Sequence, residues 1–250
     1  MAAGGKEMKR TEITFDFGTV PGAMRPYLEQ ATIYDSSCSE AAKTLFVEGA
    51  EHAFLKICAG GSLERECRMT RFMHGLGLAP DVIAYESDGE RDYLLTEAVE
   101  GQDGAEAVHL EQPDRLAAVF GESLRMLHSL PVDGCPYPHR TAEMLEEAID
   151  KGIDPGLVHR LENFTSDDVL IHGDYCLPNV ILDRFSFRSF IDVGNGGVGD
   201  RHFDLYWGLW TLRYNLKTDR YHERFLDAYG RQDVDADRLA DFTSFIEHSA

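Results

Sequence analysis

The sequence predicts an α+β protein with two lobes: a small β-rich lobe over residues 1–96, a connector over residues 97–101 and a larger, mainly helical lobe over residues 102–250. In the first part, short runs rich in β-branched and aromatic residues alternate with turn residues, as in β-strands. From Gln102 onwards, apolar residues recur at helical spacing. With 250 residues, 43% of them hydrophobic and 27% charged, the chain is long and apolar enough to bury a substantial core.

The first elements of the small lobe are a β-hairpin and a helix. The runs Ala41–Val47 and Ala53–Ile57 flank a turn at residues 48–50, which is typical of two antiparallel strands. Gly60-Gly61 then interrupts the chain, and Ser62 is the expected N-cap of a helix whose apolar residues share one face. Two further strands are expected near Asp81–Tyr85 and Tyr93–Thr96.

Long amphipathic patterns define the larger lobe. Helices are predicted over Pro113–Leu130, where Pro131 ends the pattern, and over Thr141–Lys151. A further helix follows Asp200. Its aromatic stripe is interpreted as core rather than as a ligand-binding surface and consists of Phe203, Trp207, Trp210 and Tyr214.

The charge balance restricts the class of ligand. The chain has 24 Lys and Arg residues against 44 Asp and Glu residues, a formal net charge of −20. This charge argues against nucleic acid and against an anionic membrane surface, because both need a basic footprint on the protein. A cationic small molecule fits better, although an acidic surface that serves solubility is an alternative explanation.

The cellular compartment is inferred from the cysteines and from the apolar runs. No run reaches the roughly 18 apolar residues of a membrane span, and the N-terminus lacks the apolar stretch of a signal peptide. The five cysteines are scattered and form no Cys-x-x-Cys pair. We therefore expect a reduced, cytoplasmic protein.

Polar residues gather around three short predicted strands. Val169–Ile171 precedes a loop that contains Asp174 and Asn179, and a later strand pair ends at Asp192. Each of these residues alone could merely shape a turn. Two carboxylates and an amide oxygen together are hard ligands that suit Mg²⁺, and one carboxylate can remain free to act as a base. Such a set indicates phosphoryl transfer.

The pattern His172-Gly-Asp174-x₄-Asn179, followed by Asp192-x-Gly194, resembles the signature of the aminoglycoside phosphotransferase family, and within it the 3′-type enzymes. Similarity extends to the segments around Lys56 and Glu66 and covers the chain from about Ser36 to the C-terminus. The resemblance implies a bilobal protein-kinase-like fold.

The resemblance also implies roles for individual residues. Asp174 would be the catalytic base, and Asn179 and Asp192 would hold Mg²⁺. Lys56 would contact the α- and β-phosphates. Its expected partner is Glu66, with Glu64 as the competitor about 200° around the same helix.

The nucleotide site lacks the familiar glycine motifs. There is no G-x-x-x-x-G-K-[ST] in the chain and no G-x-G-x-x-G before Lys56. The resemblance implies a serine-containing turn over Asp35–Glu40 instead, with Ser39 at the phosphates. Adenine would bond to the backbone near Thr96 and Ala98, and ATP is the expected nucleotide, with GTP as an alternative.

The expected acceptor is a cationic aminoglycoside. Four acidic groups could contact it, although Asp204 is more naturally explained as a buried group that bonds to the catalytic loop; they are Asp200, Asp204, Glu247 and the carboxylate of Ala250. Asn195 is a further expected contact, and it stands where many 3′-type members have Arg. This departure leaves the identity of the acceptor and the modified hydroxyl open.

Three functions therefore compete. The first is an ATP-dependent aminoglycoside O-phosphotransferase. The second is a kinase of the same fold for choline, a sugar, an amino alcohol or a macrolide. The third is a nucleotide-binding regulator without turnover, which the intact set of Lys56, Asp174, Asn179 and Asp192 disfavours. A monomer or weak dimer, without nucleic acid or membrane partners, is expected.

Overall fold

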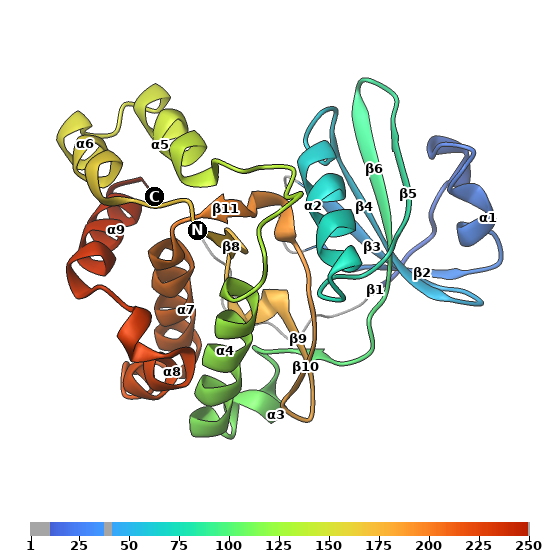
Figure 1. The fold of residues 1–250 in the computed structure, drawn as a ribbon. Coiled ribbons are helices and arrows are strands. Elements are labelled where there is room, and N and C mark those ends of the chain that lie inside the picture. Colours follow the sequence, from blue (N-terminus) through green and yellow to red (C-terminus); the bar gives the residue numbers. More distant parts are fainter. Residues whose placement is uncertain (1–10, 38–41, 250) are drawn as a thin grey trace. The chain divides into compact units, whose positions relative to one another are not determined.

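A computed structural model describes residues 11–37 and 42–249 of the chain (Figure 1). Its contacts divide the chain into an N-terminal unit, residues 1–101 and 188–194, and a C-terminal unit, residues 102–187 and 195–250. The return of residues 188–194 to the N-terminal unit was not part of the sequence-based division. Phe190 N–H donates to the carbonyl of Leu78 at 2.8 Å, and Arg65 Nε donates to the carbonyl of Gly194 at 3.0 Å.

The N-terminal unit is built on an antiparallel six-stranded sheet in the order β1-β2-β3-β4-β6-β5. The predicted hairpin is confirmed as β3 and β4, in which Thr44 pairs with Lys56. The strands are β1 (Thr11–Glu12), β2 (Thr32–Asp35), β3 (Lys43–Glu48), β4 (His52–Ala59), β5 (Val82–Ser87) and β6 (Arg91–Glu97).

The helix α2 (Glu64–Gly75) is placed by a strand distant in sequence rather than by its own N-cap. The predicted cap at Ser62 is wrong, because the helix begins after Leu63 and no side chain at that position caps it. Instead, the buried carboxylate of Asp92 on β6 accepts the Leu63 N–H at 2.8 Å. Leu63 and Cys67 then pack against Leu94, which docks α2 onto the sheet. A short helix, α1 (Arg25–Leu28), contributes Leu28 to a separate core cluster of the same unit.

The C-terminal unit is mainly helical, with two small sheets in the orders β10-β9-β7 and β11-β8. The predicted helices over residues 113–130 and 141–151 are confirmed to within two residues at each end. The helices are α3 (Ala107–Leu110), α4 (Pro113–His128), α5 (Arg140–Asp150), α6 (Pro155–Phe164), α7 (Arg201–Leu216), α8 (His222–Tyr229) and α9 (Ala236–Ser249). The strands of these two sheets are β7 (Gln102–Asp103), β8 (Val169–Ile171), β9 (Val180–Asp183), β10 (Ser186–Phe190) and β11 (Gly197–Gly199). The division between the units falls within β10, because residues 188–190 belong to the N-terminal unit.

One hydrophobic cluster of this unit lies between α5, α6, α7 and α9 (Figure 1). The aromatic stripe of α7 belongs to it: Phe203 is buried, and Trp207 and Trp210 pack against the same cluster. Tyr214 stacks on Trp210 with ring centroids 5.0 Å apart. Within the described residues, no helix has the length and apolar character that a membrane crossing requires.

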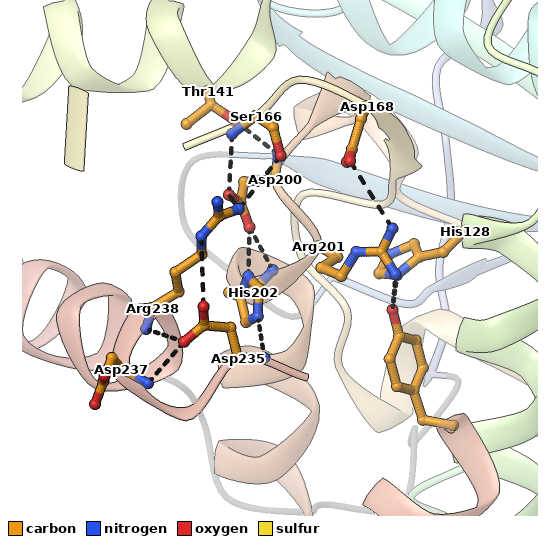
Figure 2. Close-up of polar contacts among 11 residues, drawn as sticks. His128, Thr141, Ser166, Asp168, Asp200, Arg201, His202, Asp235, Asp237 and Arg238 are labelled. Carbon is orange, nitrogen blue, oxygen red and sulfur yellow. Dashed lines mark hydrogen bonds and ion pairs between the residues drawn. The ribbon is translucent and has the colours of Figure 1, made fainter. Parts of the chain in front are cut away.

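Polar contacts fix the start of α7 (Figure 2). Asp200 caps the helix by accepting the N–H of His202 at 3.0 Å, and it also accepts the imidazole Nδ1–H at 2.6 Å. The N–H of Asp235 donates to Nε2 of the same ring at 3.0 Å, so the neutral imidazole carries its proton on Nδ1. The second Asp200 oxygen accepts the N–H of Ser166 at 3.2 Å and lies 3.6 Å from the guanidinium of Arg238.

Candidate active site

In the N-terminal unit, the ammonium of Lys56 lies between two carboxylates. Lys56 Nζ is 2.7 Å from Glu66 Oε2 and 3.0 Å from Asp192 Oδ1. Strand β4 supplies the lysine and α2 supplies the glutamate, while Asp192 follows β10. Glu64, the competing partner, pairs instead with Arg68 on the exposed side of α2.

Burial and the neighbouring charges have opposite effects on the pKa values of Lys56 and Glu66. Burial by itself would lower the pKa of Lys56, but the carboxylates of Asp192 and Glu66 outweigh it and raise the pKa above its usual value. Burial raises the pKa of Glu66, and the attraction of Lys56 offsets part of that rise. The lysine therefore stays charged at neutral pH and presents a positive charge to an anion.

The Asp192-Val193-Gly194 turn has an uncommon backbone. Asp192 adopts a left-handed conformation with φ of 55°, which is uncommon for a non-glycine residue, costs conformational free energy and is enriched at functional sites. Gly194 packs tightly on α2, because a Cβ added there would lie 3.0 Å from the Cβ of Glu66. The Asp192 side chain remains 51% exposed, so its carboxylate is open to a ligand.

In the C-terminal unit, a buried carboxylate holds the backbone of the loop that follows β8. The N–H groups of His172 and Gly173 donate to Asp204 Oδ2 at 2.6 Å and Oδ1 at 2.9 Å. Asp204 lies on α7 with no exposed surface, and His128 Nε2 is 3.3 Å away. Burial lowers the pKa of His128, although its bond to Asp204 acts in the opposite direction. Asp204 therefore positions this loop and is inaccessible to a substrate.

The same loop passes close to the turn at Asn195. Gly173 has a φ of 79°, and a Cβ added there would lie 2.0 Å from the carbonyl oxygen of Asn195. Only glycine satisfies both the backbone angle and the space. His172 is fully buried, and its Nδ1 accepts the N–H of Asp174 at 3.3 Å. The histidine thus braces the loop.

The carboxylate of Asp174 is held at both oxygens. Asn179 Nδ2 donates to Oδ2 at 2.9 Å and to the Asp174 carbonyl at 2.9 Å. The Cys176 thiol donates to Oδ1 at 3.4 Å. Burial, and then the nearby charge of Asp174, raise the pKa of this thiol, which keeps it a neutral donor. Because the amide nitrogen of Asn179 donates to Asp174, the amide oxygen of Asn179 is directed away from that carboxylate.

Asp174 opens onto a cavity of about 400 Å³ within the C-terminal unit. Gly173, Asp174 and Asn195 form one side of this cavity, and helix α5 forms another. The remaining wall is apolar and comes mainly from α7 and α9. Its members are Phe203, Trp207, Phe245 and Ile246. The volume lies near the lower end of the 300–1,000 Å³ or so typical of small-molecule pockets.

The other residues predicted from the sequence are placed as follows. Ser39 and Ala250 lie outside the described residues. The expectation that Asp200 contacts the acceptor is wrong, because its carboxylate is buried and bonded to His202 and Ser166. Glu247 is exposed on α9, beside the cavity-lining Ile246 but not itself in the lining.

At the expected adenine site, part of the backbone is already bonded. The N–H of Ala98 donates to the carbonyl of His52 at 3.0 Å, so Ala98 can offer a nucleotide only its carbonyl. Thr96 lies on β6, opposite Phe54 of β4. Thr96 is half-buried and lies near the end of the β4–β6 strand pair.

Sequence reasoning named no individual side chain of α5 as a cavity-lining group. Arg140 and Glu147 of α5 line the cavity, and so does Lys151, which directly follows the helix. The signal was present, because residues spaced by seven and four positions share one face of a helix. That face was not singled out, since a charged stripe is usually solvent-exposed.

Among residues 11–37 and 42–249, no cluster of three or more His, Cys, Asp or Glu side chains could hold a metal ion by itself. Mg²⁺ characteristically needs only one or two protein carboxylates together with substrate phosphates and water. The exposed carboxylate of Asp192 and the amide oxygen of Asn179 are donors of this type.

A lysine paired with a helix glutamate, an Asp-x-Gly turn and a loop carrying an aspartate and an asparagine are features expected of a phosphotransferase with a protein-kinase-like fold. The chain belongs to the phosphotransferase enzyme family, whose model matches residues 39–242.

Relatives and solved structures agree with this assignment. A probable aminoglycoside 3′-phosphotransferase of Lactococcus lactis is 36% identical over 249 residues, covering 91% of this chain and 94% of the relative. An aminoglycoside 3′-phosphotransferase of Niallia circulans is 31% identical over 75% of this chain and 80% of its own. A crystal structure of an aminoglycoside-3′-phosphotransferase of type VIII shares the fold with a TM-score of 0.73 and 24% identity, covering 91% of this chain and 100% of that one.

Proposed function

We propose that the protein transfers the γ-phosphate of ATP to a hydroxyl group of an aminoglycoside, with Asp174 as the catalytic base. The observation that carries this proposal is the placement of Asp174, whose carboxylate is held by Asn179 and Cys176 at the edge of a cavity of about 400 Å³. The two relatives named above are aminoglycoside 3′-phosphotransferases, one of them as a probable assignment. Their identity to this chain supports the same class of acceptor.

Asp174 would orient the acceptor hydroxyl and accept its proton as the oxygen bonds to phosphorus. Positioned bases of this kind contribute about 10²–10⁴-fold to rate. On the nucleotide side, Lys56 would bind the α- and β-phosphates, and Glu66 would keep its ammonium in place. We propose Ser39 as a further phosphate contact. The backbone of Thr96 and the carbonyl of Ala98 would bond to the adenine.

Asn179 and Asp192 would hold Mg²⁺, and their oxygen donors suit that ion. When bound, Mg²⁺ supplies neutralisation of the negative charge on the nucleotide phosphates. Related folds have been solved with nucleotides. Examples are an aminoglycoside phosphotransferase of Streptomyces rimosus in complex with ADP and streptomycin, and a thermostable mutant of another aminoglycoside phosphotransferase in complex with AMP-PNP and hygromycin B. These complexes make an adenine nucleotide the first ligand to test.

The decisive experiment is a coupled ADP-release assay with ATP and Mg²⁺ against kanamycin and neomycin, with Asp174→Ala as the control. Turnover in the wild type that falls by at least about 10²-fold in the variant is the expected result. Stabilisation by ATP and Mg²⁺ in a thermal-shift measurement, without turnover on any aminoglycoside, would reject this acceptor class. A kinase for another hydroxylated small molecule, or a regulator without turnover, would then be tested next by an acceptor screen.

A further inference from the structure

The start of helix α2 is bound to the sheet of the N-terminal unit at two polar points. The carboxylate of Asp92 on β6 accepts the Leu63 N–H, directly before the helix, at 2.8 Å. Three positions further along the chain, Glu66 binds the ammonium of Lys56 on β4 at 2.7 Å. Asp92 has no exposed surface, whereas the Lys56 side chain is 22% exposed. Asp92 can therefore influence a bound ligand only through the helix.

The register of β4 and β6 puts both points on one face of the sheet. Lys56 pairs with Leu94, and two positions further along β4, Cys58 pairs with Asp92. Side chains that are directly opposite each other, or two positions apart on one strand, share a face. Cys58 and Leu94 also belong to the hydrophobic cluster that contains Leu63. Two attachments about 7 Å apart along the strands fix the rotation of α2 as well as its position.

Asp92 supplies an acceptor that the local sequence of α2 lacks. Leu63, at the N-cap position, has no polar side chain, and Gly61 has a φ of 82° and open space around it. Burial by itself would raise the pKa of Asp92, but hydrogen bonds, first that of the Leu63 N–H, outweigh it and lower the pKa below its usual value. The ionised carboxylate is favourable at this place, because the N-terminus of a helix carries a partial positive charge.

The first turn of α2 is also bound to the turn that carries Asp192. Arg65 Nε donates to the carbonyl of Gly194 at 3.0 Å. A Cβ added to Gly194 would lie 3.0 Å from the Cβ of Glu66, so this turn and the helix cannot shift independently. Asp192 is itself 3.0 Å from the ammonium of Lys56. A displaced α2 would therefore disturb both groups to which we assign the phosphates and Mg²⁺ in this unit.

Building on the proposed role of Lys56 at the nucleotide phosphates, we infer that Asp92 is a positioning residue for nucleotide binding. Its carboxylate fixes the first turn of α2, and this turn holds Glu66 against Lys56. Asp92 touches neither the nucleotide nor the metal, because it is fully buried beneath the helix start. It acts through Glu66, which distinguishes it from a residue that only stabilises the fold.

The test is a double-mutant cycle, measured by calorimetric titration of ATP in the presence of Mg²⁺. Asp92→Ala removes the acceptor of the Leu63 N–H, and the Kd for ATP is expected to rise about tenfold. Glu66→Gln alone is expected to raise the Kd by a similar factor. Because Asp92 acts through Glu66, the double variant should bind within about threefold of the weaker single variant. A rise of about a hundredfold, the product of two independent effects, would overturn the inference.

Further variants separate positioning from a general loss of structure. Asp92→Asn keeps an oxygen acceptor of the same size and should restore the Kd to within about threefold of the wild type. Asp88→Ala makes the alanine change at a carboxylate that binds backbone N–H groups of the β5–β6 turn instead of the helix, and it should leave the Kd unchanged. Asp92→Ser shortens the acceptor and replaces the alanine variant in the cycle if that variant does not fold. No recovery in Asp92→Asn, or an equal rise of the Kd in Asp88→Ala, would overturn the inference.

The outcomes distinguish failure of this inference from failure of the proposed function. A Kd for ATP that is unchanged in Asp92→Ala overturns the inference and leaves the proposed reaction standing. The expected changes of the Kd, without turnover on any aminoglycoside, support the inference and reject only the proposed acceptor. A wild type that does not bind ATP with Mg²⁺ rejects both. Where turnover is present, Asp92→Ala should raise KM for ATP and leave KM for kanamycin unchanged, and an equal rise of both would overturn the inference.

Discussion

The two units hold their functional groups by different kinds of contact. In the N-terminal unit, Lys56, Glu66 and Asp192 are partly exposed side chains that satisfy one another. In the C-terminal unit, the loop that carries Asp174 is held by hydrogen bonds from its backbone N–H groups to the fully buried carboxylate of Asp204. Side-chain ion pairs can exchange partners when phosphates arrive, whereas backbone bonds to a buried group cannot be replaced without unfolding the loop.

This difference suggests that the contacts of Lys56 can adjust to a ligand, whereas the position of the loop that carries Asp174 is preset by the fold. The contacts of Lys56 are ion pairs between side chains, so they can change partners without moving the backbone. A buried carboxylate is stable only when its bonds are complete, so the loop has one well-defined position. Mutations should therefore have different effects in the two units. In the C-terminal unit they should mainly lower the free energy of unfolding, and in the N-terminal unit they should mainly weaken ligand binding.

The largest effect is expected for Asp204→Ala. The substitution leaves the N–H groups of His172 and Gly173 without their acceptor, which should lower the free energy of unfolding by about 3–5 kcal/mol. Urea denaturation measures this loss. Asp204→Asn keeps one acceptor oxygen and should lose less. A decrease below about 1 kcal/mol for the alanine variant would contradict the preset character of the loop.

Gly173→Ala tests the same loop from its other side. A left-handed φ costs an alanine about 1–2 kcal/mol, and the overlap with the Asn195 carbonyl adds to this. Gly152→Ala is the matched control, since Gly152 has nearly the same φ, 78°, but open space around it. The difference between the two variants in thermal unfolding isolates the steric contribution. Equal losses would show that the loop can move away from Asn195.

A smaller and different effect is expected for Glu66→Gln. Lys56 keeps Asp192 as a partner and the glutamine still offers it a carbonyl oxygen, so the free energy of unfolding should fall by about 1–2 kcal/mol, less than for Asp204→Ala. The ammonium is less well positioned for phosphates, and KM for ATP should rise about tenfold. Steady-state kinetics at varied ATP measures this, with Glu64→Gln as the control for the charge on α2. A stability loss as large as that of Asp204→Ala would remove the contrast between the units.

The elements that could be predicted from the sequence are those set by patterns within one short segment. The β3–β4 hairpin, the helices of the larger part and the loop between His172 and Asn179 are each contained in one short segment. Helical geometry separates Glu64 from Glu66, and the structure places Glu66 against Lys56. Asp204 could be interpreted as a loop-binding group because the pattern Asp200-x₃-Asp204 resembles a landmark of the same family.

Contacts between distant segments were not predictable in this way. The N-terminus of α2 is bound by Asp92, 29 positions away from Leu63, so a local rule assigned the cap to Ser62. Arg140 meets the carbonyl of Asn195 across 55 positions. The polarity of the cavity depends on this long-range packing, because it decides which charges of α5 are neutralised.

Asp103 offers a last comparison, because it is a buried carboxylate of the C-terminal unit with fewer partners than Asp204. Its Oδ1 accepts the N–H of Ala105 at 2.8 Å. Burial raises the pKa of Asp103 to about 6, although the bond from Ala105 acts against the rise. The neighbouring Gly104 N–H donates to the carbonyls of Leu177 and Val180, so Gly104 borders the loop that carries Asp174.

The pH dependence of stability follows from that raised pKa. Between about pH 4 and pH 6 the folded chain binds more protons at Asp103 than the unfolded chain, so the free energy of unfolding falls as the pH rises through this range, by at most about 3 kcal/mol. Asp103→Asn keeps the acceptor for Ala105 but does not titrate. It should flatten the fall and stabilise the protein by about 1–2 kcal/mol at pH 7.5, measured by urea denaturation at several pH values. The exposed Asp114→Asn controls for charge. If the asparagine variant were less stable at pH 7.5, ionised Asp103 would be well solvated or paired, and Asp204 would not be exceptional among the buried carboxylates of this unit.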